Sequence, residues 1–76
     1  MFIVIEIQVN QDGTVGNIVT SYADRNEAEQ KFHQVAAAAA VSALPCHAVT
    51  MLTERGTLVR AEHYTHTTDS ETTIEE

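Results

Sequence analysis

The chain has 76 residues, 43% of them hydrophobic, and eleven acidic side chains against four basic ones give it a formal net charge of −7. This length allows one small domain, whose limited core usually needs support from a disulfide, a metal or a partner subunit. A lone cysteine excludes an internal disulfide. The negative charge argues against binding to a nucleic-acid backbone or an anionic membrane, because both need clustered Lys and Arg.

The first residues lack the features of a signal peptide. Residues 1–9 are apolar, but no basic residue precedes them, Glu6 interrupts them and no small-residue cleavage site follows. No strongly apolar stretch approaches the ~20 residues that a membrane-spanning helix needs. Together with the lone cysteine, these features predict a cytoplasmic protein.

A β-hairpin is expected at the start of the chain. Residues 1–9 have the period of a strand, with one face fully apolar and the other apolar over its first half. Residues 15–22 form the returning strand. Between them, Asp12-Gly13 supplies the positive φ that a hairpin connection needs.

A helix follows from residue 24. Asp24 and Glu27 have the spacing of a capping box, and Pro45 is expected to end the helix near Leu44. Apolar residues at helical spacing predict the side that faces the sheet. This inward stripe consists of Ala28, Phe32, Val35, Ala39 and either Ser42 or Ala43.

Two further strands complete the predicted fold, over residues 46–53 and 57–64. The sequence therefore predicts an α+β fold of ββαββ type, a four-stranded, mainly antiparallel sheet of order 2-1-3-4 with one helix packed on one face. Residues 1–64 form this single domain. Residues 65–76 are Thr-rich and carry four acids and no Lys or Arg, which predicts a disordered acidic tail.

From Phe32 to Thr53 the sequence has no Asp, Glu, Lys or Arg. A helix on the surface of a monomer should show a polar outer face, and the second half of this helix has none. We therefore expect a homodimer or a higher symmetric oligomer. The alternative is that the alanine run reflects helix propensity only. The predicted interface residues are Val35, Ala36, Ala37, Ala40, Val41 and Leu44.

No residue pattern indicates catalysis or metal binding. Cys46, His47, His63 and His66 are suitable zinc ligands, but neighbouring residues of a strand point to opposite faces and no recognised ligand spacing is present. We therefore expect surface histidines and no metal. Phosphate-binding loops and nucleophile motifs are also missing, so we expect a protein that is not an enzyme and uses no cofactor.

The fourth strand offers a candidate ligand-binding surface. If the helix covers Val59, Ala61 and His63, then Arg60, Glu62 and Tyr64 lie on the open face of the sheet. We expect Glu6, Gln8 and Asn17 to lie beside them. An arginine suits the binding of an anionic group, a tyrosine suits stacking on a planar ring, and carboxylates suit the binding of hydroxyl groups. The alternative is a solvated face on which Arg60 pairs with Glu6 or Glu62.

Several segments also carry a resemblance: Ile5-Glu6-Ile7-Gln8, residues 24–33, the Ala-rich residues 35–44, His47-Ala48, and Tyr64-Thr65-His66 followed by an acidic tail. In these segments the chain resembles small uncharacterised proteins encoded in phages and prophages of gut Firmicutes. That family has no assigned activity. The resemblance implies a mobile-element origin and a location in the host cell cytoplasm, and it adds Arg25, Lys31 and His33 to the residues of interest.

Together, these features predict a small, non-catalytic, homo-oligomeric binding protein of phage type. The specific hypothesis is an anti-defence factor that sequesters a nucleotide-derived signal molecule between subunits. One alternative is an acidic inhibitor that mimics nucleic acid towards a basic host enzyme. Another is a structural or assembly accessory of a virion. The candidate ligand-binding residues are Arg60, Tyr64, Glu62, Glu6, Arg25 and His33.

Overall fold

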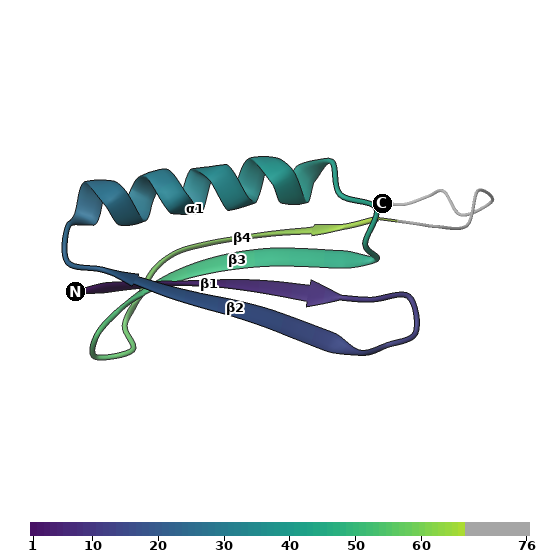
Figure 1. Ribbon diagram of the computed structural model, residues 1–76, viewed down its shortest axis with the longest axis horizontal. Helices are drawn as coiled ribbons and strands as arrows, with labels where there is room; N and C mark the ends of the chain where they lie inside the picture. Colours follow the sequence, from purple (N-terminus) through teal and green to yellow (C-terminus); the bar gives the residue numbers. More distant parts are fainter. Residues whose placement is uncertain (67–76) are drawn as a thin grey trace.

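The computed structural model describes residues 1–66, in which one helix lies across one face of a single sheet (Figure 1). The elements are β1 (Phe2–Val9), β2 (Val15–Tyr22), α1 (Arg25–Ala40), β3 (Cys46–Thr53) and β4 (Leu58–Thr65). This arrangement confirms the predicted α+β fold of ββαββ type. In the part of the chain described, no helix is long and apolar enough to cross a membrane.

The sheet has the strand order β2-β1-β3-β4, and every neighbouring pair is antiparallel. This order was predicted because it places the most apolar strand in the interior of the sheet. Both hairpin connections contain a glycine with positive φ, 89° at Gly13 and 82° at Gly56. The glycines allow the chain to reverse where another residue would be strained.

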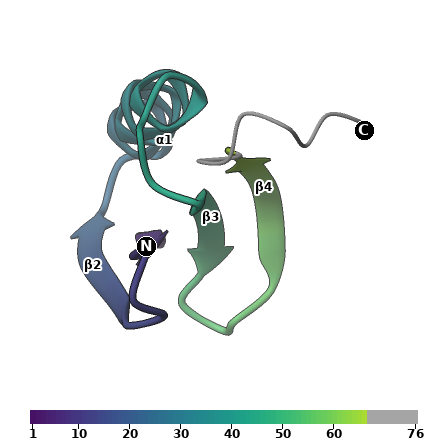
Figure 2. The same ribbon diagram turned by 90° about the vertical axis from the view of Figure 1, so that its right-hand side faces the viewer.

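Helix α1 connects two parallel strands, because β2 and β3 are both antiparallel to the strand β1 between them. The path from β2 through α1 to β3 is right-handed (Figure 2), as such crossovers nearly always are. Handedness therefore decides which face of the sheet the helix covers. The covered face of β1 carries Phe2, Val4, Glu6 and Gln8.

The prediction that Glu6, Gln8, Arg60, Glu62 and Tyr64 lie on the open face is consequently wrong. Their strand partners are buried beneath the helix: Glu6 and Glu62 both lie opposite Val49, and Arg60 lies opposite Met51. A register shift between Met51 and Leu52 also separates Leu58 from Arg60, so that these two residues occupy different faces. Sequence alternation does not reveal such a β-bulge.

The core lies between the helix and the two central strands. Its sheet side consists of Val4, Val49 and Met51, which are all 1% exposed or less. The helix side confirms four residues of the predicted inward stripe and adds Ala36, whereas the last predicted position, Ser42 or Ala43, lies beyond the end of the helix at Ala40. The buried helix residues are Ala28, Phe32, Val35, Ala36 and Ala39.

Helix α1 begins as predicted and ends earlier than predicted. The carboxylate of Asp24 caps it by accepting a hydrogen bond of 3.3 Å from the backbone N–H of Asn26. The end near Leu44 is wrong, because the last helical residue is Ala40. The hydroxyl of Ser42 accepts a hydrogen bond from the backbone N–H of Leu44, and this local turn replaces a further helical turn.

The folded part extends slightly beyond residue 64. Thr65 is the last residue of β4, and the backbone N–H of His66 donates to the carbonyl of Pro45 at 2.9 Å. The imidazole of His66 also donates to the carbonyl of Ala39, near the end of the helix. The rest of the predicted acidic tail, residues 67–76, lies outside the described residues.

Candidate functional site

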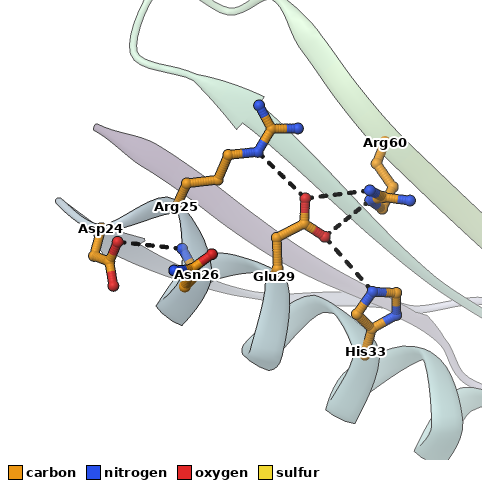
Figure 3. Close-up of polar contacts among 6 residues, drawn as sticks. All are labelled: Asp24, Arg25, Asn26, Glu29, His33 and Arg60. Atoms are coloured by element: carbon orange, nitrogen blue, oxygen red, sulfur yellow. Dashed lines mark hydrogen bonds and ion pairs between the residues drawn. The ribbon is translucent and has the colours of Figure 1, made fainter.

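Cationic side chains from two elements meet beside the first half of the helix (Figure 3). Arg25, Glu29 and His33 follow one another at four-residue spacing along α1, so their side chains share one side of the helix. Arg60 reaches the same place from β4. These four residues are called the Arg25–Arg60 cluster below.

Glu29 is the centre of the Arg25–Arg60 cluster. Arg60 binds both of its carboxylate oxygens, with Nε 3.1 Å from Oε1 and Nη2 3.2 Å from Oε2. Arg25 Nε lies 3.4 Å from Oε2, and His33 Nε2 lies 3.5 Å from Oε1. The two-pronged contact from Arg60 is the geometry in which a guanidinium recognises a carboxylate or a phosphate.

Aromatic rings support the cationic groups. The guanidinium carbon of Arg60 lies 5.8 Å from the ring centre of Phe32, and that of Arg25 lies 5.8 Å from the ring centre of Phe2. The ring of His33 stands edge-on to Phe32 at 5.5 Å. Because Phe32 is buried in the core, Arg60 is held against a fixed surface.

The two arginines keep Glu29 ionised. Burial raises the pKa of the Glu29 carboxyl, but the hydrogen bonds and charges of Arg60 and Arg25 lower this pKa by more, and the net pKa lies below the usual value. The cluster therefore contains one carboxylate and two guanidinium groups near neutral pH. These three groups sum to a charge of +1, and Glu62 lies two residues from Arg60 on the same face of β4.

Part of the hydrogen-bonding capacity of the cluster faces solvent. Arg25 is 57% exposed and Arg60 43% exposed, whereas Glu29 is only 20% exposed. The terminal nitrogens of Arg25 point away from Glu29 (Figure 3), and among residues 1–66 Arg25 donates only from Nε. The outer edge of the cluster can therefore bind an additional anionic group.

The other predicted ligand-binding residues make no hydrogen bond or ion pair with this cluster among residues 1–66. Glu62 and Tyr64 continue along β4 on the face of Arg60, opposite Val49 and His47 respectively. Glu6 forms a different contact under the helix, described next. Of the six candidates, the structure thus brings Arg25, His33 and Arg60 together.

Glu6 and His47 form a buried pair between β1 and β3. The imidazole of His47 donates from Nε2 to Glu6 Oε2 at 2.7 Å, and Gln8 donates to the same oxygen at 2.9 Å. Burial raises the pKa of Glu6, but the hydrogen bonds from His47 and Gln8 lower this pKa by more, so it lies below its usual value. His47 is 5% exposed, which corrects the prediction of a surface histidine.

The six predicted interface residues fall into two groups. Val35 and Ala36 are buried against the sheet of the same chain, with exposed fractions of 6% and 9%. The others lie on or beyond the outer side of the helix. Ala37 and Ala40 are exposed, Val41 is 85% exposed and Leu44 is half-buried.

Sequence reasoning missed Glu29 and His47. Glu29 could have been found from its spacing of four residues to both Arg25 and His33, which predicts contacts along one side of a helix. His47 could have been found from the alternation with Val49 and Met51, which places it on the covered face. Within residues 1–66, no three His, Cys, Asp or Glu side chains are grouped so that they could hold a metal ion.

Comparison of the chain with protein-family models, with curated proteins and with solved structures finds no match. The phage-type resemblance therefore stays a prediction.

Proposed function

We propose that this chain is a small, non-catalytic binding protein that works as a homo-oligomer and holds an anionic, nucleotide-derived ligand at the Arg25–Arg60 cluster. The observation that supports this proposal is the convergence of Arg25, His33 and Arg60 on a single carboxylate. A chain with only four Lys and Arg residues has two of them here.

The chemistry of the cluster fits a phosphate group better than a neutral ligand. A guanidinium presents donors in a planar fork that matches two oxygens of a phosphate. The terminal donors of Arg25 point away from Glu29 (Figure 3), and Arg60 is held by its contacts with Glu29 and Phe32. Tyr64, two strand positions beyond Glu62, offers an aromatic ring for a base on the same face of β4.

The proposal is tested by thermal unfolding with a panel of cyclic nucleotides and ADP-ribose derivatives. A ligand that binds the folded form only must raise its melting temperature. We expect at least one member of the panel to do so, and we expect Arg60→Gln to weaken its binding about ten- to a hundred-fold, because a charge-assisted hydrogen bond contributes ~1.5–3 kcal/mol.

The matched control is Arg55→Gln. Arg55 is exposed in the turn between β3 and β4, so this variant removes the same charge outside the cluster and should bind as the wild type does. If no member of the panel raises the melting temperature, or if both variants lose binding equally, the cluster is not the ligand site.

A further inference from the structure

The open face of the sheet carries no Asp, Glu, Lys or Arg, although the chain is strongly acidic. The four strands contain only three such residues, Glu6, Arg60 and Glu62, and all three lie on the helix-covered face. On β1, the open face consists of Ile3, Ile5, Ile7 and Val9. The more apolar face of this central strand therefore points away from the helix.

For the charged residues, this distribution is the reverse of the usual one. An antiparallel sheet with one packed face normally has apolar residues on that face and polar residues on the other. Here the open face extends its apolar surface to the edge strands, where Val15, Val19 and Leu58 are 62%, 58% and 60% exposed. The same face also carries polar residues of other types, four of them on the edge strands: Asn17, Ser21, Thr50, His63 and Thr65. An aliphatic patch centred on β1 and free of Asp, Glu, Lys and Arg marks an interaction site.

Nothing among residues 1–66 covers this face. The end view shows α1 on one side of the four strands and no element on the other side (Figure 2). The helix side already contains a complete small core, formed around Phe32, Val49 and Met51. A second apolar layer is therefore available for a partner.

We propose that two copies of this chain pack face to face through these open sheet faces. The product is a four-layer dimer with a helix on each outside and a sheet-on-sheet core in the middle. This inference rests on the self-association that belongs to the proposed function and is independent of the ligand. It places the subunit contact on the sheet, away from the exposed alanines of the helix.

The size of the open face suits a specific dimer. Four strands at ~4.8 Å spacing and eight residues of ~3.4 Å each give a flat footprint of roughly 500 Å². The accessible area is larger because the side chains project from the sheet. The smaller specific interfaces bury ~600 Å² on each partner, so this face reaches the required range. The outer side of one helix offers only a narrow stripe around Ala37 and Ala40.

Charge favours a second copy over other occupants. In a symmetric dimer the same surface is used twice, so a face with an excess of one charge would oppose like charges. Although each chain has a net charge of −7, the strands place no Asp, Glu, Lys or Arg on the open face, so this face avoids such repulsion. The same negative charge opposes an anionic lipid surface as the alternative occupant.

The test is the molar mass in solution, measured by light scattering after size exclusion. The wild-type chain should have twice the mass of one 8.3 kDa subunit. Val19→Lys and Leu58→Lys place a charge on the open face at edge-strand positions that are already exposed in a single copy, and both should halve the mass. Lysine is chosen because it reduces the net negative charge, so the loss of the dimer cannot come from general repulsion. Circular dichroism verifies that each variant is folded.

The matched control is Ala37→Lys, which makes the same change of charge on the outer side of the helix and should leave the mass at two subunits. If both open-face variants stay dimeric, the surface assigned here is wrong while self-association stands. If the wild type is a monomer at high micromolar concentration, self-association itself is wrong. Neither result affects the ligand test, which measures binding at Arg60.

Discussion

Glu6 and His47 form a hydrogen-bonded polar pair beneath the helix. The carboxylate of Glu6 accepts from both His47 and Gln8, whereas His47 Nδ1 is buried without a partner among the described residues. An unpartnered buried nitrogen costs about 1–3 kcal/mol. The hydrogen bond of the pair links β1 to β3, whereas the unpartnered Nδ1 atom of His47 lowers the free energy of unfolding.

Protonation of Glu6 is expected to destabilise the fold. Its pKa in the folded chain is below the usual value, so its ionised form stabilises the fold above the pH of ordinary Glu titration, about 4.3. This contribution is lost as the pH falls through the lowered pKa. Glu6→Gln removes it, because the amide has no charge at any pH.

We therefore expect Glu6→Gln to lower the free energy of unfolding by about 2 kcal/mol at pH 7, since a hydrogen bond to a charged group is lost. Between pH 6 and pH 3, its stability should fall less than that of the wild type. The measurement is the midpoint of urea unfolding as a function of pH. Equal losses for the two proteins in acid would contradict the role of the pair.

At the scale of elements, strand positions and strand order follow from the sequence because they depend on local signals. Period-two alternation defines β1, and Asp12-Gly13 defines the first turn. The covered face of the sheet does not follow, because it depends on the handedness of the crossover through α1. The β-bulge beside Leu52 is a tertiary effect of the same kind, whereas the early end of the helix at Ala40 comes with the local turn that Ser42 and Leu44 form.

The candidate site follows from the sequence only in part. Arg60 was selected for its chemistry, and Arg25 and His33 by resemblance. The residue that brings them together, Glu29, contacts β4 through a pairing between positions 31 residues apart. A contact at such separation depends on where the helix lies on the sheet, which local patterns do not determine.

The N-cap of α1 provides a test of one local signal. Asp24→Ala removes the carboxylate that accepts from the N–H of Asn26 and should reduce the free energy of unfolding by about 1 kcal/mol. Asp24→Asn keeps a capping oxygen and should cost less. Both values come from urea unfolding at pH 7. A cost for Asp24→Asn equal to that for Asp24→Ala would show that the charge, and not the cap, stabilises the helix.

At the scale of the whole molecule, the two faces of the sheet explain how so small a chain can be stable. Among residues 1–66, the core between helix and sheet has eight buried hydrophobic residues, three of which are alanines and contribute little apolar area. The larger aliphatic residues Ile3, Ile5 and Ile7 lie on the other face. A dimer through that face adds the second core that the monomer lacks.

Such a dimer makes the melting temperature depend on protein concentration, because unfolding releases two chains. With an enthalpy of ~0.7 kcal/mol per residue, a dimer of this length has an unfolding enthalpy of about 100 kcal/mol, and each tenfold increase in concentration should raise the melting temperature by about 5 °C. Val19→Lys should melt at a temperature that does not change with concentration. The measurement is calorimetry or circular dichroism over a hundredfold range. A wild-type melting temperature that is equally constant would mean that the chain folds and unfolds as a monomer, and that the apolar face of the sheet is not the source of its stability.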